Sequence, residues 1–263
     1  MAYADTRMPE LVPDRLETPM AFVIRWIPLA IVAILWEVAS GWVVAEAVLP
    51  GPMAVFAETW EVLITGTAIP HLFISAVRVL LGLFLSIVVG VMLGIGIARS
   101  DPVEDFFDVF LSLLYPIPKS ALVPLAILWL GIGTKTAVFV VFLACLLPIV
   151  LNSYNAAASV DRNLLWSARM MGTSGRELLY KIVVPATVPE IITGIRQAIP
   201  IAFIALVSAE LIASNRGIGH LILSSGQVGN YPSMFAAILL ISLVAYVAVR
   251  GFEYLEREAI AWT

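Results

Sequence analysis

Long apolar runs constrain this chain more than any other feature, because a helix needs about 20 mostly apolar residues to cross a bilayer. Six segments reach or approach that length, at roughly residues 24–45, 72–98, 107–130, 134–152, 190–213 and 233–251. The chain is 61% hydrophobic and only 13% charged, whereas about a quarter of the residues in soluble domains are charged. The sequence therefore predicts an all-α, polytopic transmembrane helix bundle with six spans.

Several of these segments carry signals beyond hydropathy. Gly90 and Gly94 form a GxxxG pair, which permits close backbone contact within a bundle or across a dimer. Prolines 116, 118 and 124 predict a kinked or broken helix in segment 107–130. Between the first two spans, apolar residues at helical spacing predict a short helix over residues 53–64 at the outer interface.

The distribution of Lys and Arg predicts the orientation of the spans. Residues 1–20 show no cleavable signal pattern and are expected to form a cytoplasmic tail. Residues 21–263 are expected to form one transmembrane domain with both chain termini in the cytoplasm. In that orientation most cations, among them Arg169 and Arg250, lie on the cytoplasmic side.

A charged island at residues 161–189 interrupts the apolar sequence. Gly172 can take the left-handed turn that ends a short helix, and Ser174 and Glu177 have the spacing of a capping box that starts another. Pro185 is expected to stop that second helix and to push the residue before it toward extended geometry. The island is therefore predicted to form two short amphipathic helices that contact a partner.

Glu37, Arg78 and Glu210 are ionisable residues within apolar segments, where charge is costly and suggests function. Arg78 and Glu210 fall at similar depth if their spans are antiparallel, so they either form an ion pair or separately reach the outer interface or an aqueous cleft. Glu37 either carries protons, bonds to a neighbouring helix or faces water. All three are candidate translocation-path or intramembrane polar residues.

Chemistry-bearing residues are otherwise sparse. Cys145 is the single cysteine, and His71 and His220 are too isolated in the sequence to indicate a metal centre. The chain has no G-x-x-x-x-G-K-[ST] motif, so it cannot bind ATP in the P-loop manner. We expect no catalytic residue, no metal and no cofactor bound by this chain.

The island resembles the cytoplasmic loop of bacterial ABC importer permeases, which reads Glu-Ala-Ala, three residues, Gly, nine residues, Ile, one residue, Leu-Pro. The matching residues are Trp166, Ser167, Ala168, Gly172, Ile182, Val184 and Pro185. Other stretches resemble the nitrate/sulfonate/taurine/bicarbonate branch: LPGP at 49–52, HLFISAVRVLLG at 71–82, LGIGIARS ending at Ser100, YPIPKSALVPLAILWLGIG at 115–133 and AELIASNRGIGHLI at 209–222.

The resemblance implies the permease subunit of an ATP-driven importer in the bacterial inner membrane. It implies transport of a small anion or related solute, such as a sulfonate, taurine, nitrate or bicarbonate. The implied partners are a second permease copy, two ATPase subunits that hold ATP and Mg²⁺, and a periplasmic or lipid-anchored binding protein, with no nucleic acid. The loop at about 153–189 is then the ATPase-coupling loop.

One residue departs from the family pattern. Trp166 stands where the family has the glutamate that helps the loop dock on the ATPase. Its ring either enters a groove of the ATPase, as aromatic anchors do, or packs against the bundle at the membrane interface. The rival class is an ion-coupled secondary transporter or a channel, which needs intramembrane coupling groups or filter-like repeats. The sequence shows neither of these features.

Overall fold

The computed structural model describes residues 19–99, 101–114 and 117–259, and the regular elements in these ranges are helices. Contacts divide the chain into two compact units, with the division between Phe56 and Ala57. The elements in chain order are α1 (Pro19–Trp42), α2 (Pro52–Ile64), α3 (Ile69–Ile97), α4 (Asp101–Leu114), η1 (Lys119–Leu122), α5 (Val123–Leu130), α6 (Thr134–Ala158), α7 (Arg162–Met170), α8 (Gly175–Leu178), the π-helical turn η2 (Leu179–Val183), α9 (Val184–Ala213), α10 (Ile218–Gln227) and α11 (Tyr231–Ala259).

In the first unit, a turn folds back onto α1. The helical geometry of α1 breaks at Ser40 and Gly41. The Trp36 indole donates a hydrogen bond to the Pro50 carbonyl at 3.1 Å, and the Ser40 hydroxyl donates to the Leu49 carbonyl at 2.7 Å. These two bonds tie the predicted rigid turn to the helix. The short helix predicted at residues 53–64 is confirmed as α2.

Four helices among the described residues are long and apolar enough to cross a membrane. They are α3, α6, the continuous run 175–213 that ends in α9, and α11, and they confirm the second, fourth, fifth and sixth predicted spans. The first predicted span coincides with α1, whose apolar part Trp26–Trp42 is shorter than a typical span. A count of six spans is therefore not confirmed by length and composition.

The third predicted segment, 107–130, is broken into α4, η1 and α5, as its prolines predicted. Its count as one membrane span is not confirmed, because none of these pieces is long enough by itself. Pro118 is extended, with φ −64° and ψ 113°, and Pro124 lies in the first turn of α5, where its missing amide costs nothing. The kink expected at Pro116 falls outside the described residues.

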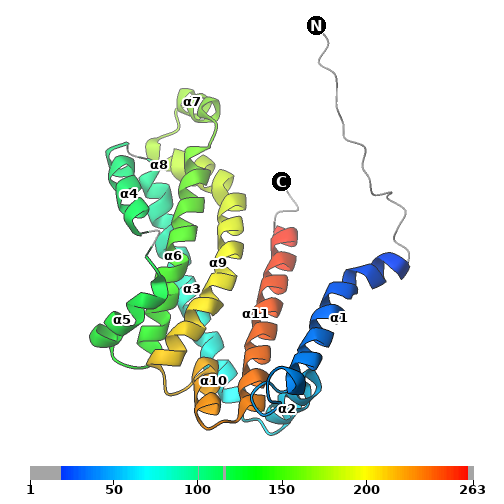
Figure 1. Ribbon diagram of the computed structural model, residues 1–263. Helices are drawn as coiled ribbons and strands as arrows, with labels where there is room; N and C mark the ends of the chain where they lie inside the picture. Colours follow the sequence, from blue (N-terminus) through cyan, green and yellow to red (C-terminus); the bar gives the residue numbers. More distant parts are fainter. Residues whose placement is uncertain (1–18, 100, 115–116, 260–263) are drawn as a thin grey trace. The chain divides into compact units, whose positions relative to one another are not determined.

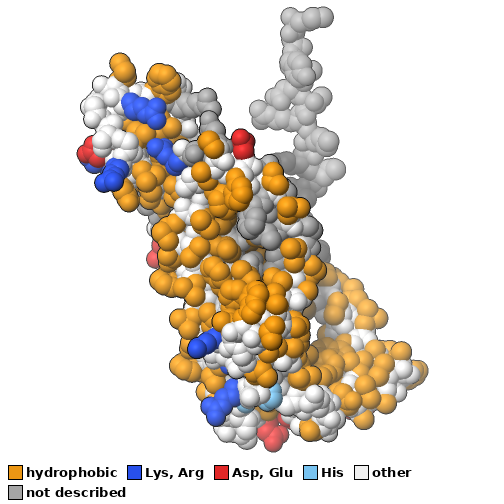
Figure 2. Space-filling view, turned by 90° about the vertical axis from the view of Figure 1, so that its left-hand side faces the viewer, with side chains coloured by type: hydrophobic (Ala, Val, Ile, Leu, Met, Phe, Trp, Pro, Cys, Tyr) orange, Lys and Arg blue, Asp and Glu red, His pale blue; other side chains and the backbone are white. Residues whose placement is uncertain are grey.

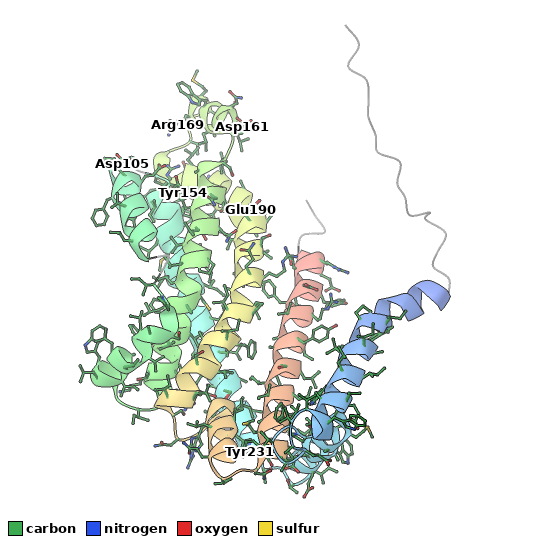
Figure 3. All side chains as sticks on the ribbon, viewed as in Figure 1. Asp105, Tyr154, Asp161, Arg169, Glu190 and Tyr231 are labelled. Carbon is green, nitrogen blue, oxygen red and sulfur yellow. The ribbon has the colours of Figure 1, made fainter. Side chains whose placement is uncertain are left out.

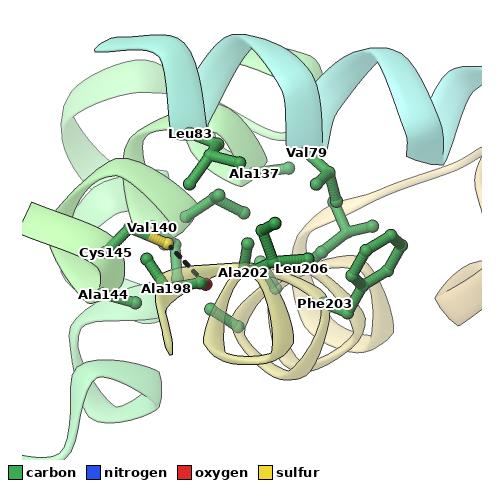
Figure 4. Packing of buried hydrophobic residues seen from close by; sticks show 14 of the residues in the cluster. Val79, Leu83, Ala137, Val140, Ala144, Cys145, Ala198, Ala202, Phe203 and Leu206 are labelled. Carbon is green, nitrogen blue, oxygen red and sulfur yellow. Dashed lines mark hydrogen bonds between the residues drawn. The ribbon is translucent and has the colours of Figure 1, made fainter. Parts of the chain in front are cut away.

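Helices α3, α6 and α9 pack side by side and form the core of the second unit (Figure 1). Three glycines of α3 allow this contact. A Cβ atom at Gly82, Gly90 or Gly94 would lie 2.6–2.8 Å from a side-chain carbon of α6, which is closer than real contacts allow. The predicted small-residue packing is therefore confirmed, and it operates within the chain. Buried aliphatic side chains of α6 and α9 complete the core (Figure 4).

The surface of the second unit follows the pattern expected for a membrane protein. On the face shown in Figure 2, the Lys and Arg side chains gather toward the two ends, and hydrophobic atoms cover the region between them. Large side chains of the long helices, such as Phe84 (61% exposed) and Val247 (59% exposed), lie on the outside. Exposed apolar surface of this extent is stable only in contact with lipid or another protein.

Candidate functional site

Helix α7 begins and ends at residues that satisfy its free backbone groups. The Asp161 carboxylate accepts a hydrogen bond from the Asn163 amide at 2.8 Å and caps the N-terminus. At the other end, Gly172 has a φ of +86°. The amide of Thr173 donates to the carbonyl of Ala168 at 3.1 Å, which closes the helix in the manner of a Schellman motif. The predicted turn at Gly172 is confirmed.

Helix α8 starts with the predicted capping box. The Ser174 hydroxyl accepts from the Glu177 amide at 3.3 Å, and the Glu177 carboxylate accepts from the Ser174 amide at 3.1 Å. Lys181 Nζ donates to the same carboxylate at 3.0 Å. The hydrogen bond from Lys181, followed by those from Ser174, stabilises the charged form and lowers the pKa of Glu177 to about 2.

This lowered pKa predicts how the loop responds to acid. A carboxylate with a lowered folded-state pKa stabilises the fold above its ordinary pKa, near 4.5, and that contribution disappears as the pH falls toward 2. We expect the ¹³C-carboxyl resonance of Glu177 to titrate near pH 2 in the labelled protein, and Glu177→Gln assigns it. Lys181→Ala removes the hydrogen bond that contributes most to the lowered pKa of Glu177. It should therefore raise the pH at which Glu177 titrates. An unchanged midpoint in Lys181→Ala would contradict this assignment.

The second short helix does not stop at Pro185, and this prediction was wrong. Val184 is helical, with φ −58° and ψ −50°, and the chain runs without a break from α8 through η2 into α9. The carbonyl that a proline ring normally clashes with is four residues earlier, at Lys181. Lys181 lies inside the π-helical turn, where the Val184 amide bonds to the Leu179 carbonyl, five residues back. The wider turn relieves the clash, so the helix continues.

The α7–α8 loop, defined as residues 161–178, has a buried side that fixes it to the bundle. Ala168 is 2% exposed and Leu178 is fully buried. Val183 follows the loop and belongs to a small apolar cluster with Ile95 of α3 and Ile191 of α9. Ile182 is half-buried and Pro185 is exposed. The loop is therefore attached directly to two long helices of the bundle.

The opposite side of this segment is apolar and open. We define the exposed apolar face as Trp166 (66% exposed), Met170 (86%), Met171 (80%) and Tyr180 (71%). Ser167, next to Trp166, is also exposed, and no atom lies within 4 Å of a Cβ placed at Gly172. Most of the Trp166 ring is thus free of contact with the described bundle. Figure 3 shows Asp161 and Arg169 of this loop at the same end of the unit as Asp105, Tyr154 and Glu190, and Tyr231 at the other end.

The second group of candidate residues forms a buried ion pair. Arg78 Nη1 lies 2.7 Å from Glu210 Oε1, and the two side chains are 4% and 0% exposed. The ion-pair alternative for these residues is therefore correct, and neither side chain reaches the surface. Arg78 also donates to the Thr134 hydroxyl from Nε at 3.2 Å and from Nη2 at 3.1 Å. Its Nη1 further donates to the Ser214 hydroxyl at 2.8 Å.

Glu210 accepts hydrogen bonds from two helices, α3 and α10. The Ser75 hydroxyl lies 2.9 Å from both carboxylate oxygens, and the Gly219 amide donates to Oε2 at 2.9 Å. Gly217 has a φ of +114°, and a Cβ there would lie 2.3 Å from Glu210 Oε1. Glycine is therefore required at this position. Nearby, the Gly217 amide donates to His71 Nδ1 at 3.1 Å.

Sequence reasoning missed Ser75, Thr134, Ser214, Gly217 and Gly219 as members of this network. A signal was present in helical spacing, because Ser75 is three residues before Arg78 and Ser214 is four residues after Glu210. The contacts join the stretches 71–82 and 209–222, each of which resembles the family in sequence. Their role here is to hold α3, α6, α9 and α10 together at one end.

Glu37 belongs to the first unit. Its side chain is exposed, and a Cβ at Gly51 would lie 3.1 Å from its Oε2 atom. It therefore flanks the turn that follows α1. In the described part of the chain, no group of three or more His, Cys, Asp or Glu side chains is placed to hold a metal ion.

The fold and the loop define a class: a helical membrane protein that presents a two-helix loop beyond one end of its bundle. Comparison with known proteins identifies the family. Residues 86–260 match the model of the binding-protein-dependent transport system inner membrane component. The chain belongs to this family and is a permease component of an ABC importer.

Curated relatives match over most of their length. A putative ABC transporter permease of Methanocaldococcus jannaschii is 32% identical, with 89% of each chain covered. The putative aliphatic sulfonates transport permease SsuC of Bacillus subtilis is also 32% identical, over 90% of this chain and 86% of its own. The taurine transport system permease TauC of Escherichia coli is 29% identical, over 86% and 84%.

Solved structures share the fold. A chain of the inward-facing MetNI methionine ABC transporter aligns with a TM-score of 0.65 at 15% identity, covering 74% of this chain and 97% of its own. A chain of a bacterial ABC transporter involved in alginate import aligns with a TM-score of 0.61 at 15% identity, covering 91% and 93%. These likenesses support the all-helical permease architecture.

Proposed function

We propose that this permease docks on a separate ATPase through the exposed apolar face of its α7–α8 loop and carries a small anion of the sulfonate or taurine type. The observation that carries the docking proposal is the exposure of Trp166, Met170 and Met171 on the α7–α8 loop and of Tyr180 directly after it, while Ala168 and Leu178 of the loop are buried. Large apolar side chains are rarely left exposed together unless a partner covers them. Tryptophan is also enriched among the residues that dominate interface energy.

The connection between the loop and the spans supports a coupling role. The loop continues into α9 as one helix through η2, so a push on α7 or α8 is transmitted along a rigid element. In this proposal, closure of two ATPase subunits moves two permease copies between inward-open and outward-open states. The loop is then cytoplasmic, and a binding protein delivers substrate at the opposite end.

A groove along α9 is the proposed wall of the translocation path. Its volume is about 430 Å³, between α6, α9 and η1. The Ser120 and Ser208 hydroxyls interrupt an otherwise apolar lining of Ala144, Leu147, Pro148, Ile201, Ile204 and Ala205. The Ser208 hydroxyl already donates to the Ile204 carbonyl at 2.9 Å, so Ser120 is the better placed of the two for brief contact with sulfonate oxygens. The lack of a fixed charge among these lining residues leaves selection to the binding protein.

Alanine substitution of two docking residues tests the proposed contact. Trp166→Ala with Met170→Ala should weaken co-purification with the cognate ATPase by about 30-fold or more, as expected for interface residues worth at least about 2 kcal/mol. Trp129→Ala is the matched control, because Trp129 is 62% exposed on α5, outside the loop. Equal ATPase recovery with the double variant and the control would contradict docking through this face.

Reconstitution separates the proposed function from the rival class. In liposomes that contain the permease and ATPase, substrate-loaded binding protein should stimulate ATP hydrolysis and uptake together. Uptake by the permease alone, driven by an ion gradient, would instead indicate a secondary transporter. A thermal-shift screen of the binding protein with sulfonates, nitrate and carboxylates identifies the substrate class.

A further inference from the structure

We propose that the cleft between α9 and α11 binds an anionic phospholipid, with its phosphate at an arginine cluster and one acyl chain along the adjoining apolar groove. The arginine cluster lines a hollow of about 410 Å³ made by Arg196, Arg250, Glu253, Glu256 and Arg257. The apolar groove, about 530 Å³, is lined by Pro200, Phe203, Ile204, Val207, Ser208, Ile241, Ser242 and Ala245. Both hollows lie between the same two helices.

Helical spacing places the two hollows on one continuous strip. On α9, Arg196 precedes Pro200 and Ile204 at intervals of four residues. On α11, Ala245 precedes Glu253 and Arg257 by eight and twelve residues. Residues four apart are neighbours on a helix surface, so such a series forms a continuous row that winds slowly around the helix. From Arg196 to Ser208 the strip is about 18 Å long, at 1.5 Å per residue. A charged end followed by an apolar groove matches the order of headgroup and acyl chain in a phospholipid.

The cluster keeps hydrogen-bond donors for a phosphate. Arg250 Nη1 pairs with Glu253 at 2.9 Å, and Arg196 Nη1 lies 3.5 Å from Glu256. Arg257 is exposed and forms no ion pair with the described residues. Three arginines against two glutamates leave one net positive charge. A guanidinium has five N–H donors, so donors remain after these pairs form, and arginine binds phosphate oxygens in a bidentate manner.

The position of the cluster favours lipid over other occupants. It lies where α9 and α11 approach the end of the unit that carries α7, the side proposed to be cytoplasmic. Basic pockets between spanning helices on that side recognise anionic headgroups. Tyr246 and Tyr254 of α11 are 58% and 63% exposed, and tyrosine is enriched at headgroup depth. Ile204 and Ser208 line both this groove and the proposed wall of the translocation path, so they lie at the border of the two hollows. The inference uses the membrane location and the proposed orientation, and it does not depend on which substrate is transported.

Lipid titration of the purified full-length permease tests the site. Thermal stabilisation by phosphatidylglycerol and by phosphatidylcholine is measured for the wild type, Arg257→Gln and Lys135→Gln. Lys135 is an exposed cation at the start of α6, so its variant controls for loss of one charge. We expect Arg257→Gln to weaken phosphatidylglycerol binding about fivefold and to leave phosphatidylcholine binding unchanged. Arg257 is substituted in preference to Arg196 or Arg250, because each of those two pairs with a glutamate that its removal would leave without a partner.

Filling the apolar groove gives an independent readout. Ser242→Phe should weaken binding of both lipids, whereas Leu243→Phe, at a neighbouring exposed position, should weaken neither. Equal phosphatidylglycerol binding by Arg257→Gln and Lys135→Gln would overturn the proposal. So would equal stabilisation by inorganic phosphate alone, which would indicate a free-anion site. Disulfide-linked dimers of Ser242→Cys that form regardless of added lipid would assign the groove to a second copy of the chain.

Discussion

Replacing Glu210 with glutamine is expected to lower the free energy of unfolding by about 3–5 kcal/mol, because it leaves Arg78 buried without a counter-charge. The two side chains are 0% and 4% exposed and 2.7 Å apart. The same change also weakens the hydrogen bonds that Glu210 accepts from Ser75 and from the Gly219 amide. Arg78→Gln should be similarly costly. Denaturant titration of the purified protein in detergent measures both effects.

A double-mutant cycle separates the pair from its surroundings. Arg78→Gln combined with Glu210→Gln removes both charges, so its cost should be well below the sum of the single costs. The control pair is Arg250 and Glu253, which are 52% and 27% exposed and 2.9 Å apart. Exposed pairs contribute roughly 0–1 kcal/mol. If the double variant loses as much unfolding free energy as the two single variants together, Arg78 and Glu210 do not act as a unit.

Gly94→Ala is expected to destabilise the bundle by about 1–3 kcal/mol through overpacking. The new Cβ would lie 2.6 Å from the Ser153 Cβ and 2.6 Å from the Val150 carbonyl oxygen of α6. A backbone carbonyl cannot rotate away as a side chain can, so the two helices must separate. Gly96→Ala is the matched control on the same helix, because a Cβ there meets no atom within 4 Å.

The Gly96→Ala control should be neutral or slightly stabilising, since alanine has the higher helix propensity. The melting temperatures of the two variants, measured side by side in the same detergent, give the comparison. Equal melting temperatures would mean that α3 and α6 are not in the close contact described. A lowered melting temperature in both variants would point to a general effect of glycine replacement in α3.

Features determined by near neighbours in the chain were predicted well. The turn at Gly172 and the capping box of Ser174 and Glu177 involve residues within five positions of one another. Their hydrogen bonds depend on local backbone geometry, which residue type controls directly. Pro185 was the exception, since the preceding π-helical turn accommodates a ring that an α-helix would not.

Contacts between distant segments could not be predicted to the same degree. Depth in the membrane allowed Arg78 and Glu210 either to pair or to separate. The pairing depends on the rotation of α3 and α9 about their axes, and on a loop with Gly217 and Gly219 that encloses the carboxylate. The family-like stretches were visible in the sequence, but their mutual contact was not.

By itself the sequence determined the membrane class, four of the spans, the break near Pro118, the turn that ends α7 and the capping box that starts α8. Hydropathy and backbone preference act locally, so these features are largely independent of what packs around them. The tertiary structure decided which side of the α7–α8 loop is buried, leaving Trp166 exposed, and which polar groups meet between α3 and α9. Those outcomes depend on how helices more than 130 residues apart in the chain pack together, and a lone segment carries no such information.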